Sequence, residues 1–294
     1  MFPIITHGSS EDALKALRDN GAAILRDPDR TIDEFVSFTD EFVDADPYHS
    51  VATGERDTAG AEGTNIATVN KGVGAMALHR ESSFLPTQPD VVALFCERAP
   101  GRGGETTVCD GVKLRAALPE ELRTFLEHEV LVWRFVMPVE RWSVIYGTDR
   151  PEQAAQRIKE LMDRFAPTAT YDFAFTDDNE LDGTYRAPFV SPTFWNGVPA
   201  FSNSLLYWYH NQGPFIAKRL HHVTLSNGDR ISADVVEAIE ECAEKLTVGM
   251  DWQRGDIVLL DNSRVMHGRR AIVDSQRRIL VRLGRYRPET TSSV

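Results

Sequence analysis

The chain has 294 residues and a formal net charge of −12, which disfavours nucleic acid and anionic membrane surfaces as partners. No apolar run reaches the roughly 18 residues of a membrane span, and the N-terminus lacks the basic segment of a secretion signal. The chain has three cysteines, and their spacing matches neither a disulfide framework nor a metal-binding knuckle, so we expect a cytoplasmic protein.

The first third of the chain begins with alternating helices and strands. Residues 9–21 predict a capped helix closed by Gly21, and residues 22–26 predict a short strand. Residues 31–43 predict a second helix, because Thr31 and Glu34 have capping-box spacing. The polar, glycine-rich residues from about 45 to 75 are typical of a flexible loop.

Strands are predicted again at 91–99, 256–262 and 278–286, and helices at 118–129, 150–165 and 232–246. Strands thus lie at both ends of the chain, with helical insertions at about 110–250. This order favours an α+β protein with a β-sandwich or jelly-roll core decorated by helices. We expect one domain over residues 1–294.

The stretch "ALHRESSF" places His79 and Glu81 two positions apart. In a strand both side chains would face one side while Arg80 turned away. Most such pairs are simply solvated, but one more histidine would complete a facial triad for non-haem Fe(II). His267 is the best third ligand among the eight histidines, because it follows a predicted strand in "GDIVLLDNSRVMHGR".

The ordered set of motifs is more specific than any one of them. It consists of H-x-E, then "GGET", "GDIVLLDN", "HGR" and "RRILVR". Over about residues 65–288 the chain resembles the Fe(II)- and 2-oxoglutarate-dependent oxygenases of the taurine dioxygenase (TauD/TfdA) family, in the H-x-E branch that includes clavaminate synthase and the syringomycin-pathway aspartyl hydroxylase. The resemblance implies a double-stranded β-helix, or jelly roll, as the core. It also implies Fe(II), 2-oxoglutarate and O2 as cofactor and cosubstrates, with His79, Glu81 and His267 as metal ligands.

The same resemblance implies a site for the cosubstrate. Arg278 would bind the far carboxylate of 2-oxoglutarate, for which a guanidinium has matching geometry, and Thr106 would donate a hydroxyl. The adjacent Arg277 and Thr107 are the alternatives, because only one residue of each pair can point inward from a strand. Arg282 shares the parity of Arg278, so it would either bind a substrate anion or lie on a solvated face.

Further residues are candidates for substrate contacts or metal ligands. Asn203, in the aromatic segment "SNSLLYWYHN", and Asn70, just before the metal strand, are candidate substrate contacts. Core packing is the alternative for that aromatic segment. The remaining candidate ligands have polar surroundings and are more typical of surface positions: His210, His221 and His222.

The resemblance implies an oxygenase that hydroxylates a small polar molecule, an amino acid or a derivative, in specialised metabolism. Desaturation or oxidative ring closure would use the same site, and a non-catalytic jelly-roll binding protein is the alternative of another class. Halogenation is disfavoured, because related halogenases have a small residue in place of Glu81. The acidic chain favours a free substrate over one tethered to an acidic carrier protein. Nothing in the sequence indicates an oligomeric state.

Overall fold

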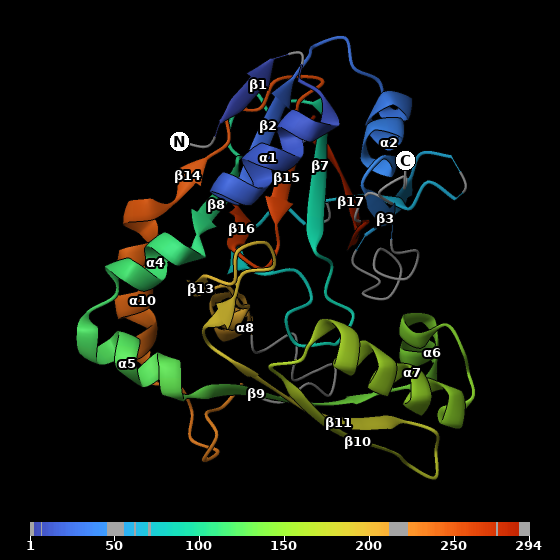
Figure 1. Cartoon of the computed structure of the whole chain (residues 1–294), viewed down its shortest axis with the longest axis vertical. Coiled ribbons are helices and arrows are strands. Elements are labelled where there is room, and N and C mark those ends of the chain that lie inside the picture. Colours follow the sequence, from blue (N-terminus) through green and yellow to red (C-terminus); the bar gives the residue numbers. More distant parts are fainter. Residues whose placement is uncertain are drawn as a thin grey trace, which may run out of the picture.

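Two facing β-sheets form the upper half of the molecule, and an insertion of helices and a third sheet forms the lower half (Figure 1). The computed structural model describes residues 3–6, 8–45, 56–61, 63–69, 72–211, 223–274 and 276–287, without the side chain of residue 165. The predicted flexible loop therefore lies partly outside the described residues. Its described part contains two short strands, at 58–59 and 66–68.

The larger sheet has eight strands and is mixed. Only the edge pair of β1 and β2 is parallel, and the pairings in the rest of the sheet are antiparallel. The strand β3 pairs with β17 at one end of that strand. In spatial order the strands are β1 (Ile4–Thr6), β2 (Ala22–Arg26), β15 (Ile257–Asp261), β7 (Val91–Arg98), β17 (Arg278–Tyr286), β5 (Ile66–Thr68) and β4 (Thr58–Ala59), with β3 (Val43–Ala45) beside β17.

The smaller sheet has four antiparallel strands and faces the larger one. Its strands in order are β14 (Val248–Gly249), β8 (Thr106–Asp110), β16 (Val265–Arg269) and β6 (Met76–His79). Val108 and Val265 of this sheet share one buried cluster with Ile279 and Val281 of the larger sheet. Apolar side chains from alternate positions of both sheets therefore form the inner core, as the predicted jelly roll requires.

Two helices cover the outer face of the larger sheet. α1 (Ser10–Asn20) has the capping box of Ser9 at its start and Gly21 in the left-handed conformation at its end, as predicted. α2 (Ile32–Asp40) has the predicted capping box of Thr31 and Glu34 but ends earlier than expected, since residues 43–45 form β3. A second buried cluster packs these helices against the sheet.

The insertion between β8 and β14 holds the predicted helices and a sheet that was not predicted. Its helices are α4 (Gly111–Ala117), α5 (Glu120–His128), α6 (Val139–Tyr146), α7 (Pro151–Phe165), α8 (Leu205–His210) and α10 (Ala233–Leu246). Its strands are β9 (Val130–Met137), β10 (Thr170–Phe175) and β11 (Leu181–Pro188) in one antiparallel sheet, and the short pair β12 (Ser191–Pro192) and β13 (Pro199–Ala200). Within the described residues, no helix has the length and apolar character needed to cross a membrane.

The turn before β15 depends on a glycine. Gly255 has a φ of +81°, and a Cβ atom there would lie 1.9 Å from the backbone oxygen of Asp27. Gly63 has a similar φ of +84°, but a Cβ atom there would meet no described atom within 4 Å. The two glycines thus share the backbone conformation and differ in crowding.

We expect Gly255→Ala to destabilise the fold more than Gly63→Ala. Both substitutions should lower the free energy of unfolding by about 1–2 kcal/mol, because they place a side chain in the left-handed region. Only Gly255→Ala adds an overpacking cost of about 1–3 kcal/mol. Urea denaturation of the two variants measures the difference in the free energy of unfolding. Equal losses in the two variants would contradict the crowding at Gly255.

Candidate metal centre

Two neighbouring strands of the smaller sheet bring the two histidines together. His79 ends β6 and is paired in register with His267 of β16, and the centroids of the two rings lie 4.3 Å apart. Gly268 follows His267 at a β-bulge, and a Cβ atom there would lie 2.6 Å from the backbone oxygen of Met76. The glycine therefore lets the two strands approach closely beside the paired histidines.

Glu81 lies beyond the end of β6, in a turn, and not within a strand as the i, i+2 argument assumed. The side chain of Asn262, which is fully buried, positions this turn. Its Oδ1 accepts from the backbone N–H of Glu81 at 2.8 Å, and its Nδ2 donates to the backbone oxygens of Glu81 and Pro89. The next residue, Ser82, has a φ of +54°, so the chain reverses direction directly after the carboxylate.

The three side chains present their donor atoms to one point. Glu81 Oε2 lies 3.7 Å from His267 Nε2 and 4.0 Å from His79 Nε2, and each of the three residues is 8% exposed. Nitrogen and oxygen ligands bind first-row divalent metals at about 2.0–2.2 Å, so two ligands of one ion lie within about 4.4 Å of each other. The group therefore fits one divalent ion, and it is the only such group found among the described residues.

The protonation states also suit a metal. His79 Nδ1 lies 3.0 Å from the backbone oxygen of Ala77, which assigns the proton to Nδ1 and leaves the Nε2 lone pair for a ligand bond. Burial, together with His267, lowers the pKa of His79 to about 3, so its ring is neutral at physiological pH. Although burial alone raises the pKa of Glu81, the charge of Arg56 and the two histidines bring it well below its ordinary value.

A cation from the segment before β4 reaches the centre. Arg56 Nη2 donates to Glu81 Oε2 at 2.8 Å, and its side chain is 17% exposed. Tyr207 of α8 packs on another side, with its ring 5.1 Å from that of His79. Neither residue was identified from the sequence, because both contacts join segments far apart in the chain.

A second buried site lies along the same inner face. Thr106 belongs to β8, two residues from Val108, which is paired with His267. Its hydroxyl accepts from Trp252 Nε1 at 3.1 Å and from an Nη atom of Arg277 at 3.4 Å, and Arg277 is 3% exposed. Two residues of a strand span about 7 Å, so Thr106 and Arg277 lie about one small dicarboxylate from the metal centre.

Arg269 adds a second buried guanidinium here. It donates to the backbone oxygens of Val69, Gly72 and Gly74, and it is paired with Thr106 across β16 and β8. Burial and the nearby charge of Arg269 lower the pKa of Arg277 to about 10, which still leaves Arg277 charged at neutral pH. Two neighbouring buried cations favour an anion between or beside them.

The placement of Arg278 contradicts the prediction that this residue faces the pocket. Its side chain is 49% exposed and forms an ion pair with Glu97 at 2.6 Å. On β17 the inner core receives Ile279 and Val281, so the residues of the same parity as Arg278 face the other way. Arg277, which was considered as the alternative, is the arginine beside Thr106.

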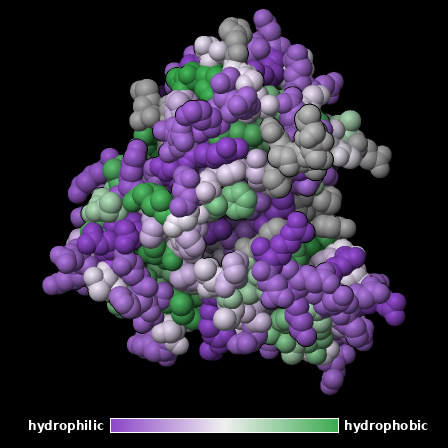
Figure 2. All heavy atoms as spheres, viewed as in Figure 1, coloured by the Kyte–Doolittle hydropathy of each residue, from purple (hydrophilic) through white to green (hydrophobic). Residues whose placement is uncertain are grey.

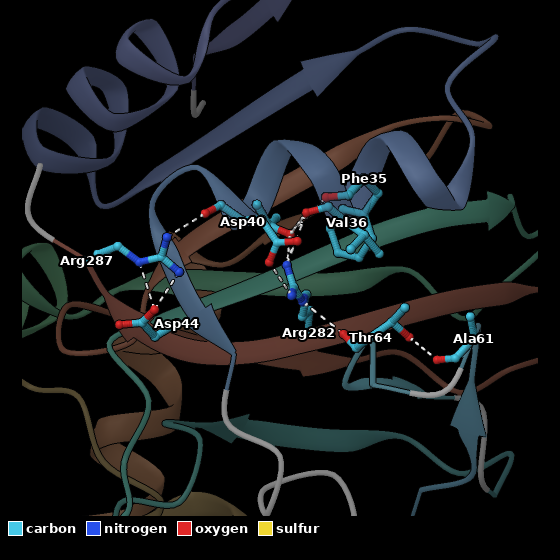
Figure 3. Close-up of polar contacts among 9 residues, drawn as sticks. Phe35, Val36, Asp40, Asp44, Ala61, Thr64, Arg282 and Arg287 are labelled. Carbon is cyan, nitrogen blue, oxygen red and sulfur yellow. Dashed lines mark hydrogen bonds and ion pairs between the residues drawn. The ribbon is translucent and has the colours of Figure 1, made fainter.

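The same strand alternation places Arg282 on the helix-covered face of the larger sheet, so the predicted contact with a substrate anion at the metal is wrong. Figure 3 shows its guanidinium beneath α2. It donates to Asp40 Oδ1 and Thr39 Oγ1 at 2.6 Å each, and to the backbone oxygens of Val36 and Thr64. Arg282 therefore ties α2 and the 63–65 segment to β17.

The remaining candidates lie elsewhere or outside the described residues. Asn203 uses its side chain internally, donating to the backbone oxygen of Phe189 and accepting from the backbone N–H of Leu205. His210 is half-exposed, and its Nε2 lies 2.6 Å from Glu240 Oε1. Three other candidates fall outside the described residues: Asn70, His221 and His222.

Comparisons with known proteins agree with this geometry. The family described as "Taurine catabolism dioxygenase TauD, TfdA family" matches residues 5–283. A clavaminate synthase-like protein of Arabidopsis thaliana is 24% identical over 277 residues, which cover 91% of this chain and 82% of that protein. Dapdiamide synthesis protein DdaC of Enterobacter agglomerans is 22% identical over 227 residues, covering 71% of this chain and 66% of that protein.

Among solved structures, a taurine dioxygenase from Burkholderia xenovorans superimposes with a TM-score of 0.58 at 15% identity, over 95% of this chain and 80% of that one. This similarity confirms the jelly-roll fold. Since the family match spans nearly the whole chain and the structure brings His79, Glu81 and His267 together, the chain belongs to the TauD/TfdA family of Fe(II)- and 2-oxoglutarate-dependent dioxygenases.

Proposed function

We propose that this enzyme hydroxylates a small polar substrate that carries a carboxylate, an amino acid or a derivative, in specialised metabolism. The convergence of one carboxylate and two imidazoles on a single point is the observation that carries the oxygenase chemistry. The similarity to a dapdiamide synthesis protein supports a role in the synthesis of a small natural product. Product mass tests the reaction type, since hydroxylation adds one oxygen and desaturation or ring closure removes two hydrogens.

The metal ligands in this proposal are His79, Glu81 and His267. Fe(II) held by this triad, together with 2-oxoglutarate and O2, would supply the oxidation of an unactivated C–H bond. The neutral His79 ring would offer its Nε2 lone pair to the ion, and the Glu81 carboxylate would offset part of the ion's charge. Asn262 acts as a positioning residue, because its amide holds the backbone of Glu81 from both sides.

Arg277 is the proposed partner of the far carboxylate of 2-oxoglutarate, in place of Arg278. Its support is its burial on the inner face and its contact with Thr106. Thr106 keeps its proposed role as a hydroxyl donor to the same cosubstrate. The nearby charge of Arg269 adds to the attraction of an anion into this part of the barrel.

Arg56 is the proposed partner of the substrate carboxylate, in place of Arg282. Its guanidinium is the cation that the described structure brings into contact with a ligand of the metal centre, and it is partly exposed. A guanidinium held at Glu81 is close enough to orient a substrate whose reacting carbon must lie beside the metal. The acidic chain still favours a free substrate over an acidic carrier protein.

Removing one ligand should strongly weaken metal binding and leave the fold intact. We expect His267→Ala to weaken Fe(II) binding by at least about 100-fold, since even residues that only orient ligands change affinity 10–100-fold. Anaerobic calorimetry with Fe(II) measures this, and circular dichroism checks the fold. His210→Ala, at an exposed histidine, is the control and should bind like the original chain. Unchanged binding in His267→Ala would exclude the proposed centre.

The cosubstrate assignment predicts opposite behaviour of two adjacent arginines. Arg277→Ala should raise the apparent KM for 2-oxoglutarate at least tenfold, because losing a buried charged partner costs about 2–5 kcal/mol. Arg278→Ala, which removes a half-exposed ion pair, should change it less than twofold. Both KM values are measured from the rate of succinate release, with amino acids screened as the substrate. A larger effect in Arg278→Ala would reverse the assignment.

The substrate assignment predicts a selective effect at Arg56. Arg56→Gln should raise the KM for the carboxylate substrate about tenfold or more, and it should equalise turnover of that acid and its amide. Fe(II) affinity is measured separately, because Arg56 also contacts Glu81. Arg270→Gln is the control at a surface ion pair with Glu244. An unchanged preference for the acid, or turnover of carrier-bound substrates alone, would disprove this role.

A further inference from the structure

The indole of Trp252 contacts the hydroxyl that is proposed to bind the cosubstrate. Trp252 lies just after β14, where the backbone N–H of Met250 donates to the backbone oxygen of Thr106 at 2.8 Å and so continues the pairing of β14 with β8. Trp252 Nε1 then donates to Thr106 Oγ1 at 3.1 Å. The segment after β14 thus holds both the backbone and the side chain of Thr106.

This contact is shielded from water. Hydrophilic residues cover most of the face of the molecule in Figure 2, and an indole on such a surface would use water as its acceptor. Trp252 is instead 6% exposed and Thr106 is 4% exposed, and the ring of Trp252 belongs to the buried cluster between the two sheets. Because close packing restricts the ring, its N–H keeps one direction, towards the hydroxyl.

The hydrogen bonds of the Thr106 hydroxyl leave one direction for its own proton. A hydroxyl can accept two hydrogen bonds and donate one. Thr106 Oγ1 accepts one from Trp252 Nε1 and the other, at 3.4 Å, from Arg277 Nη2. Within the described part of the chain these are its two hydrogen bonds, and it is the acceptor in both. The O–H is therefore directed at an acceptor from outside the described residues, such as a bound anion.

A carboxylate bound to Arg277 is the acceptor that this geometry suits. A carboxylate oxygen that accepts from the guanidinium at about 2.7–2.9 Å lies beside Thr106, because the guanidinium itself contacts the hydroxyl. The hydroxyl is also a stronger donor when it accepts hydrogen bonds, since successive hydrogen bonds polarise one another. Without the N–H of Trp252, a lone pair of the hydroxyl would be free to turn towards the anion and repel it.

We propose that Trp252 is a positioning residue for the cosubstrate: its indole N–H fixes the Thr106 hydroxyl as a donor to the carboxylate that Arg277 binds. Trp252 acts through Thr106 and does not itself bind the carboxylate. The inference rests on the proposed function, because the far carboxylate of 2-oxoglutarate is assigned there to Arg277 and Thr106. It follows that the contribution of Trp252 disappears when the Thr106 hydroxyl is removed.

The experiment is a calorimetric titration of the chain loaded with Mn(II) in place of Fe(II), so that no turnover consumes the ligand. The ligands are 2-oxoglutarate and 2-oxopentanoate, in which a methyl group replaces the far carboxylate. Trp252→Phe keeps a ring and removes the N–H, so it should weaken binding of 2-oxoglutarate about threefold to tenfold and change binding of 2-oxopentanoate by less than about twofold. Replacing the indole of Trp252 by benzothiophene, which has sulfur in place of the N–H, repeats the test where Trp252→Phe disturbs the fold.

A double-mutant cycle separates positioning from core packing. Thr106→Val removes the hydroxyl, keeps the shape of the side chain and should weaken binding of 2-oxoglutarate at least about fivefold. Adding Trp252→Phe to Thr106→Val should then cause no further loss, because the N–H has already lost its acceptor. Trp142→Phe is the matched control, since it removes a buried indole N–H that donates to the backbone oxygen of Asn179 at 2.8 Å, and it should bind both ligands like the original chain.

Three outcomes would overturn the inference: an unchanged affinity of Trp252→Phe for 2-oxoglutarate, an equal loss of both ligands, or the same loss with and without the Thr106 hydroxyl. Arg277→Ala distinguishes these failures from a failure of the proposed function. If Arg277→Ala binds 2-oxoglutarate as tightly as the original chain, the cosubstrate site is wrongly assigned and the inference fails with it. If Arg277→Ala weakens binding and Trp252→Phe does not, only the role of Trp252 is wrong.

Discussion

The antiparallel pairing of β6 with β16 is the constraint on which the metal centre depends. This pairing places His79 directly opposite His267, although the two residues are far apart in the chain. Gly268 permits the close approach of the strands, and Asn262 then holds the backbone of Glu81 beside them. Ligands from two separate segments thus meet because strand pairing and the Asn262 amide fix their backbones before any ion binds.

The charge inside the barrel and at the metal centre is opposite in sign to the net charge of the chain. The protein is acidic overall, yet buried arginines lie where the proposed reaction requires anions to bind. Arg269 and Arg277 lie inside the barrel, and Arg56 contacts the metal centre from another side. Burying a guanidinium is costly unless hydrogen bonds or an anion compensate it, and carbonyl oxygens supply part of that compensation.

The strand β17 separates two uses of arginine. Its inward positions continue the apolar core between the sheets, and its outward positions face the helices. Arg282 therefore serves the fold by joining α2 to the sheet through Asp40. Arg277, just before the strand, faces inward beside Thr106. Arg277 and Arg282 differ in strand parity, so Arg277 faces the barrel interior and Arg282 faces the helix-covered side.

Local sequence determined much of this protein. Caps at Ser9 and Thr31, the apolar strands and the histidine and glutamate motifs predicted the elements, the jelly-roll core and the three residues that converge. The caps and the apolar patterns depend on neighbours a few residues apart, which a sequence displays directly, and His267 was identified from the ordered set of motifs.

Tertiary structure alone decided which arginine points inward, which cation reaches Glu81 and what holds the glutamate in place. Arg277, Arg56 and Asn262 each act through a contact with a residue distant in the chain. Strand alternation leaves two possible faces for every side chain, and only the packing of helices and sheets on those faces selects one.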